Sequence, residues 1–331
     1  MLSFINYYIY HFIIDINKLC AMFDRIDFSL KSSEFPSLII GKLSAHEHHA
    51  DQLQMINITF NNVVYFNDEI VDDFFSYLVS HFPNIKVKFF NIKNIQKSTV
   101  ISLITNKDCL THLNDLTLID LIPLSEESVR YALSNSEIKN RLDKVQKNPH
   151  EQTFSFSCSA ISIMNYLIET NKISKDDFTS SKELEIYSQI WKAPGEEADL
   201  NKIIQFCYKN NINIIGIDVK DFRKKYLSNE KSAPMNFMFN FFRKSFKNNY
   251  VQLNSSDLNF DPFKTASKLL LIVESDPENT HVVYVSKSKN NNILVIDSAE
   301  EGSVKVYSCW KDLLSEQKKF TGIGLGLTNS N

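Results

Sequence analysis

The stretch EQTFSFSCSAISIMNYL (residues 151–167) changes from polar to apolar around a single cysteine, Cys158. The apolar residues after the cysteine recur at the spacing of one helix face: Ile161, Met164, Leu167 and Ile168. This spacing predicts a buried, central helix from about residue 158 to residue 170. Small residues flank Cys158, so the cysteine is either a buried core residue or a nucleophile presented at the start of the helix.

The composition is that of a globular protein with free thiols. The chain has 331 residues, 43% of them hydrophobic and 23% charged, with a net charge of −3. This length allows two domains, and the near-neutral charge argues against a nucleic-acid partner. The seven glycines form no phosphate-binding loop, and the five scattered cysteines contain no CxxC pair. We therefore expect a reducing compartment, with no metal site, cofactor or disulfide framework.

The N-terminal segment, MLSFINYYIYHFIIDINKLCAMF (residues 1–23), is apolar and aromatic. It lacks the basic start and the cleavage site of a signal peptide. His11 and Asp15 interrupt it, so we expect no transmembrane segment. We predict a capping or amphipathic helix within residues 1–30. A membrane-surface or secretion segment is the alternative.

Residues 31–145 contain four segments with an LxxLxL spacing, which predicts short strands around 38–40, 56–58, 85–87 and 116–118. Helical patterns lie behind these strands at 67–82, 96–113 and 125–145. The spacing resembles the leucine-rich repeat, which implies a short α/β domain with a concave binding surface. We expect this domain to recognise the substrate. An ordinary α/β domain whose strands share the spacing is the alternative.

A polar segment, DKVQKNPHEQ (residues 143–152), predicts a linker to a second domain at 150–331. Here helical patterns come first, at 158–170, 182–192, 199–210 and 219–227, with a β-branched strand at 212–218. Strand patterns follow at 267–275, 281–288, 291–298, 302–308 and 321–327. Helices followed by an antiparallel sheet are typical of an α+β domain.

Two polar residues lie at neighbouring strand ends in this domain. His281 opens one predicted strand, and Asp297 closes the next, after the polar hairpin KSKNNN (residues 287–292). An antiparallel pair brings these ends together, where a carboxylate can orient the imidazole and support its charge. Cys158, at a helix N-terminus, would be the thiol partner. Gln152 and the backbone N–H of Cys158 are candidate oxyanion donors.

These residues resemble the papain-like cysteine peptidase superfamily. The order Gln152, Cys158, His281 and Asp297 is most similar to the bacteriocin-processing peptidase-like group and to bacterial secreted cysteine protease or deamidase effectors. The resemblance implies a papain-like α+β domain. It assigns Cys158 as the nucleophile, His281 as general base and acid, Asp297 as its orienting group and Gln152 as oxyanion donor. The FSCSA context (residues 156–160) departs from the family, which often has a glycine beside the cysteine.

The function predicted from the sequence is a cysteine protease (a thiol hydrolase) that cleaves a protein substrate through an acyl-enzyme. The combination with a repeat-like domain suggests a bacterial virulence effector that acts on a host protein. Delivery would be by a non-classical or dedicated secretion system into the host cytoplasm. The alternatives are a glutamine deamidase or transglutaminase with the same triad, and a non-catalytic, repeat-based binding protein.

Overall fold

The computed structural model describes residues 25–30, 37–49, 53–60, 68–92, 95, 97–145, 148, 150–227, 242, 244–246, 249–255, 260–276, 279–299, 302–316 and 320–329. The chain divides into two compact units, Met1–Arg141 and Leu142–Asn331, each with its own sheet. The division lies next to the linker predicted at 143–152. Residues 143–145 of that predicted linker are instead the end of a helix.

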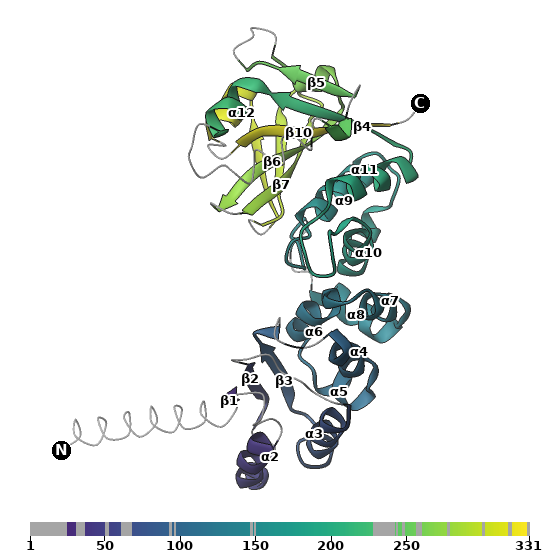
Figure 1. The fold of residues 1–331 in the computed structure, drawn as a ribbon, viewed down its shortest axis with the longest axis vertical. Helices are drawn as coiled ribbons and strands as arrows, with labels where there is room; N and C mark the ends of the chain where they lie inside the picture. The colour runs from purple at the N-terminus through teal and green to yellow at the C-terminus, as the bar shows by residue number, and fades with distance from the viewer. Residues whose placement is uncertain are drawn as a thin grey trace, which may run out of the picture. The chain divides into compact units, whose positions relative to one another are not determined.

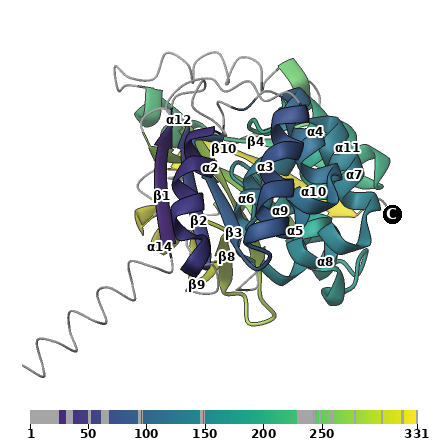
Figure 2. The same cartoon turned by 90° about the horizontal axis from the view of Figure 1, so that it is seen from below.

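The first unit contains a parallel sheet of three strands in sequence order: β1 (Arg25–Leu30), β2 (Met55–Phe60) and β3 (Lys86–Phe90) (Figure 2). Parallel strands need a crossover connection, and the helices α2 (Ser37–Leu43) and α3 (Asp68–His81) lie in the two connections. Ile56 aligns with Val87 across the sheet, and both side chains are fully buried. The sheet and these helices therefore share one core.

Further helices follow β3, and the last of them crosses the division between the two units. Their bounds are Lys97–Thr105 for α4, Lys107–His112 for α5, Asp115–Leu121 for α6, Glu126–Ser134 for α7 and Ser136–Val145 for α8, with 3-10 turns at Ser44–His49 and Ile122–Leu124. Ser125 is the N-cap of α7, because its side chain accepts a hydrogen bond from the Ser128 N–H at 3.0 Å. The helix predicted at 96–113 is broken at Asn106, which caps α5.

Two of the four predicted repeat strands are wrong. Residues 56–58 lie in β2 and residues 86 and 87 begin β3, as predicted, but 38–40 lie in α2 and 116–118 lie in α6. The Asn114 side chain accepts from the Leu116 N–H at 2.9 Å and so starts a helix there. An LxxL spacing also fits one face of a helix, and Leu118 and Leu121 are buried on α6. The leucine-rich-repeat assignment itself stays a prediction.

The N-terminal prediction is corrected in its last residues. Residues 25–30 form β1, although a helix was predicted within 1–30. Residues 1–24, which include Cys20, lie outside the described residues. Within the described ranges, every helix is too short or too polar to cross a lipid bilayer.

The second unit begins with three helices, α9 (Cys158–Glu169), α10 (Ser180–Ile190) and α11 (Leu200–Lys209), which lie beside one another (Figure 1). A seven-stranded sheet follows, in the order β5-β4-β10-β6-β7-β8-β9. The strand bounds are Ile212–Val219 (β4), Tyr250–Leu253 (β5), Lys268–Asp276 (β6), Asn279–Lys287 (β7), Ile293–Asp297 (β8), Ser303–Tyr307 (β9) and Phe320–Asn329 (β10). The helices α12 (Lys220–Leu227) and α14 (Trp310–Glu316) complete the unit.

The predicted order of helices before sheet is found, but the sheet is mixed rather than wholly antiparallel. The strand β5, which the sequence did not predict, pairs with β4 in parallel. All other neighbouring strands are antiparallel. Most of the aromatic-rich segment at 234–246 lies outside the described residues; Phe242 and Phe246 are buried.

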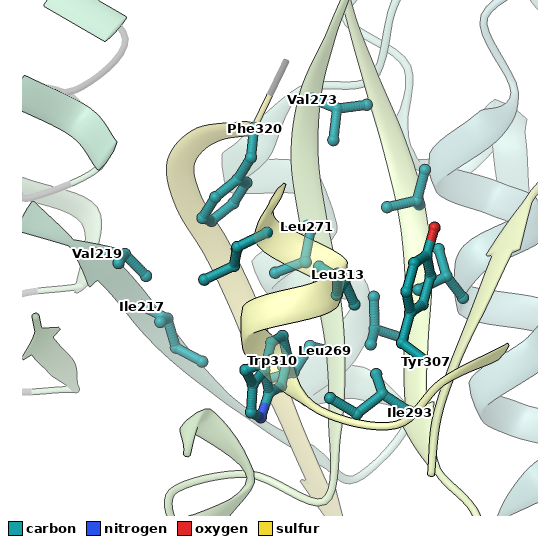
Figure 3. Packing of buried hydrophobic residues seen from close by; sticks show 14 of the residues in the cluster. Ile217, Val219, Leu269, Leu271, Val273, Ile293, Tyr307, Trp310, Leu313 and Phe320 are labelled. Carbon is teal, nitrogen blue, oxygen red and sulfur yellow. The ribbon is translucent and has the colours of Figure 1, made fainter. Parts of the chain in front are cut away.

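Side chains along β7 point alternately to the two faces of the sheet, and a different helix packs on each face. Val283 and Val285 belong to a buried core cluster. Leu313 of α14 belongs to the same cluster (Figure 3). Ser286, the residue after Val285, lies on the opposite face and is directed at α9, where its hydroxyl donates to Glu169 Oε1 at 3.0 Å. Because α9 packs on β7, the helix that begins with Cys158 is held against the strand that carries His281.

The core under α14 gives a stability prediction. The Leu313 side chain is fully buried, so Leu313→Ala should lower the free energy of unfolding by about 2–5 kcal/mol. Urea denaturation followed by circular dichroism measures this change. Val306→Ala, at a side chain that is 59% exposed on β9, is the control and should cost less than about 0.5 kcal/mol. Equal losses in the two variants would contradict the packing described.

Candidate active site

Cys158 is the first residue of α9, and its side chain is partly exposed. The nine residues after it, Ser159–Leu167, are all buried, so the helix is fixed in the core while its first residue remains partly exposed. Ser157 is the N-cap residue, but its hydroxyl donates to Glu183 and to the Phe154 carbonyl. The first N–H groups of a helix lack partners within the helix, and here they lie beside the thiol.

His281 and Asp297 are joined at the ends of neighbouring strands, as predicted. The imidazole Nε2 lies 2.7 Å from Asp297 Oδ1. That oxygen also accepts the Ala299 N–H at 3.0 Å, which fixes the carboxylate at the end of β8. The His281 residue is only 8% exposed. The carboxylate therefore sets the orientation of a nearly buried ring.

The same ring contacts the thiol. Burial lowers the pKa of His281, but hydrogen bonds with Asp297 and Cys158, together with their charges, outweigh burial and raise it to about 10. Because Nε2 is bonded to Asp297, the other ring nitrogen, Nδ1, is the one available to Cys158 Sγ. A ring protonated at neutral pH beside the thiol stabilises a thiolate, the nucleophilic form of cysteine. The structure thus brings the three predicted residues together in one interacting group.

Gln152 is tied to the residue that follows Asp297. Its backbone N–H donates to the Ser298 carbonyl at 3.2 Å, and its Oε1 accepts from the Ser298 hydroxyl at 3.1 Å. The carbonyl end of the side chain is thereby held, which leaves the Nε2 end to donate to a ligand. Ser298 is 2% exposed and was not singled out from the sequence.

A buried carboxylate holds the loop between Gln152 and Cys158. Glu183 on α10 is fully buried and accepts hydrogen bonds from Thr153, Phe154 and Ser157. Glu183 was not predicted from the sequence, because glutamate in a helix is usually exposed. A signal was present, since Glu183 precedes Tyr187 and Ile190 by four and seven residues and so lies on the buried face.

Aromatic side chains lie on the α10 side of the nucleophile. Burial raises the pKa of Tyr187, and the charge of Cys158 adds to the increase, which places the phenol near the thiol. The Tyr187 hydroxyl donates to the Glu196 carbonyl at 2.7 Å, and its ring meets Trp191 edge to face. These contacts fix the loop at 192–199 near the site. Asp199 caps α11, where its side chain accepts from the Lys202 N–H, so capping and the helix dipole explain this acid.

The remaining described cysteines have different surroundings. Cys109 and Cys207 are fully buried, and burial raises the pKa of both thiols. Cys309 is exposed. Among the described residues, no cluster of three or more histidine, cysteine or acidic side chains is arranged to hold a metal ion.

Comparisons with protein-family models, with curated proteins and with solved structures found no match to this chain. The interpretation of the site therefore depends on its geometry.

The Asp297 contact predicts the protonation of His281. With a pKa near 10, the ring should remain cationic at about pH 8, where an unperturbed histidine, with a pKa of 6.5, is neutral. NMR titration of ring-labelled histidines measures this directly. Asp297→Asn should lower the pKa of His281, whereas Asp176→Asn, at an exposed acid, should leave it unchanged. A His281 titration near 6.5 in the wild type would contradict the arrangement.

Proposed function

We propose that the second unit is a thiol hydrolase that acts on amide bonds of a protein substrate, with peptide-bond cleavage as its reaction. The observation that carries the proposal is the imidazole of His281, which is hydrogen-bonded to Asp297 and lies close enough to Cys158 for the thiol to raise the pKa of the ring. A carboxylate, an imidazole and a thiol in contact are the parts needed to activate a nucleophile and to transfer its proton. A non-catalytic binding protein, the competing interpretation, would leave this arrangement without a role.

Acylation uses the thiolate and the cationic ring. Cys158 Sγ attacks the carbonyl carbon, a C–S bond forms, and the carbonyl electrons move to oxygen. The oxyanion accepts hydrogen bonds from the Cys158 N–H and the Gln152 Nε2, which Ser298 leaves available. As the tetrahedral intermediate collapses, His281 gives its proton to the amine nitrogen. The C–N bond breaks, the amine leaves, and a thioester remains.

Deacylation reverses the roles of the ring. Neutral His281 takes a proton from water, and the oxygen of that water attacks the thioester carbonyl. The C–S bond breaks, the carboxylic acid leaves, and the thiolate is again paired with a cationic imidazole. Asp297 remains ionised and orients the ring in both steps.

The same acyl-enzyme serves glutamine deamidation when the leaving group is ammonia, and transglutamination when an amine replaces water. These reactions remain the alternatives to peptide cleavage. Substrate selection by the first unit, bacterial origin and action on a host protein also remain predictions from the sequence.

Thiol reactivity tests whether Cys158 is activated. Iodoacetamide at neutral pH should modify Cys158 at least about tenfold faster than Cys309, an exposed cysteine in the same chain. His281→Ala should remove this advantage, because the cationic ring is lost. Peptide mapping by mass spectrometry gives both rates. Similar slow modification of the two cysteines in the wild type would contradict the proposal.

Lysates of candidate host cells can show which reaction the protein catalyses. Lysate proteins are incubated with the wild type and with Cys158→Ala, then compared by mass spectrometry. New termini that need Cys158 support peptide cleavage, whereas conversion of glutamine to glutamate or new cross-links would replace cleavage by one of the alternatives. If lysates treated with the wild type and with Cys158→Ala are identical in every cell type tested, a hydrolase that acts on proteins is contradicted.

The oxyanion role of Gln152 has its own test. Gln152→Ala should lower kcat by about 100- to 1,000-fold, the usual effect of losing one oxyanion donor. Gln189→Ala, at an exposed position on α10, is the matched control and should leave kcat unchanged. A Gln152→Ala enzyme with wild-type kcat would remove this residue from the mechanism.

A further inference from the structure

We propose that Glu183 is a positioning residue for the catalytic loop. Its ionised carboxylate holds residues 153–157 so that the oxyanion donor Gln152 and the nucleophile Cys158 keep a fixed separation. The inference rests on the proposed function, because it gives the loop a catalytic purpose. Glu183 touches neither the thiol nor a reacting atom in this scheme, and it acts through the loop backbone.

The contacts reach both ends of the loop. The Thr153 N–H lies 2.9 Å from Oε1 and 3.1 Å from Oε2 of Glu183. The Phe154 N–H donates to Oε1 at 3.2 Å, and the Ser157 hydroxyl donates to the same oxygen at 2.5 Å. One carboxylate thus binds the residue after Gln152 and the residue before Cys158.

The middle of the loop has a conformation that needs such support. Phe156 has a positive φ of 66°, a region that bulky side chains rarely adopt. Its side chain is 41% exposed, whereas Phe154 is 1% exposed and anchors the loop in the core. A conformation of this kind persists only where its surroundings fix it, and such conformations cluster at functional sites. Hydrogen bonds to Glu183 on both sides of Phe156 supply that constraint.

The charge of Glu183 is essential to this role. An ionised carboxylate only accepts hydrogen bonds, and every contact from the loop is a donor. An amide would keep one neutral oxygen for the donors at Oε1 and would direct its NH₂ group at the Thr153 N–H, which now lies 3.1 Å from Oε2. Charge-assisted bonds are also about twice as strong as neutral ones. The loop should therefore be ordered when Glu183 is ionised and loosened when it is protonated.

Protonation of Glu183 falls near neutral pH. Burial raises its pKa to about 7, against the lowering effect of the bonds from Ser157, Phe154 and Thr153. No charged side chain of the described residues is among these causes. Tyr187, on the same helix, is influenced by Glu183 and Cys158, and burial keeps its phenol protonated. As the pH falls through about 7, the loop loses its anionic acceptor and the site should lose reactivity.

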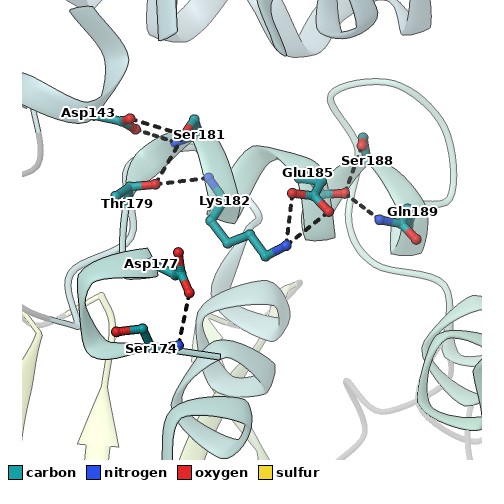
Figure 4. Close-up of polar contacts among 9 residues, drawn as sticks. All are labelled: Asp143, Ser174, Asp177, Thr179, Ser181, Lys182, Glu185, Ser188 and Gln189. Carbon is teal, nitrogen blue, oxygen red and sulfur yellow. Dashed lines mark hydrogen bonds and ion pairs between the residues drawn. The ribbon is translucent and has the colours of Figure 1, made fainter. Parts of the chain in front are cut away.

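The test compares Glu183→Gln with Glu185→Gln in the full chain. Glu185 lies two residues away on α10, is partly exposed and pairs with Lys182 at 2.9 Å (Figure 4). Alkylation of Cys158 is measured across about pH 5–9. The wild type and Glu185→Gln should show an inflection near pH 7. Glu183→Gln should lack it and should react about 10- to 100-fold more slowly at the upper end.

Amide hydrogen exchange at Thr153 and Phe154 is measured on the same proteins. It reports the hydrogen bonds from these amides to Glu183, whether or not the protein is a hydrolase. Glu183→Gln should accelerate exchange at both amides, and Glu185→Gln should not. If Cys158 is unreactive in the wild type but Glu183→Gln accelerates exchange, Glu183 holds the loop without a catalytic purpose, and the proposed function fails. Reactive Cys158 with unchanged exchange and an unchanged pH profile would overturn the Glu183 proposal alone.

If Glu183→Gln does not fold, Ser157→Ala provides the second test of the Glu183 contacts. It removes one donor to the carboxylate and leaves the buried charge bonded to Thr153 and Phe154. Folded Ser157→Ala should show faster exchange at these amides and slower Cys158 alkylation. Wild-type values for both measurements would overturn the proposal.

Discussion

The hydrogen bond between His281 and Asp297, at 2.7 Å, is the contact on which the candidate site depends. It joins the end of β8 to β7, and β7 in turn packs on α9, the helix that begins with Cys158. Because the bond occupies one ring nitrogen, the thiol meets the other. Burial would by itself make the ring neutral, so the cationic state depends on the carboxylate and the thiol.

A second layer of buried polar groups fixes the loop that enters α9. Ser298 holds the carbonyl end of Gln152, and Glu183 holds the backbone between Gln152 and Cys158. Buried polar groups are costly unless they are hydrogen-bonded, and here their bonds go to the loop beside the nucleophile. The interior of the second unit thus orders the surface on which chemistry is proposed.

Much of the second unit could be predicted from local patterns. Alternation identified six of its seven strands, and the apolar spacing after Cys158 identified α9. His281 and Asp297 could be paired because a hairpin fixes which strand ends meet. The strand β5 was missed because it is short and distant in sequence from β4. In the first unit, residues 38–40 and 116–118 were misassigned because LxxL spacing suits a helix as well as a strand entry. Glu183 was missed because tertiary contacts, rather than residue type, bury it.

Acylation of the protein by p-nitrophenyl acetate tests the central claim most directly. The Cys158 thiolate should attack the ester carbonyl, release p-nitrophenolate and retain the acetyl group as a thioester. Rapid-quench mass spectrometry should find one acetyl group per chain, located on Cys158, in a burst that is absent from His281→Ala. Acetylation spread over lysines and other cysteines, with no burst and no dependence on His281, would contradict the account.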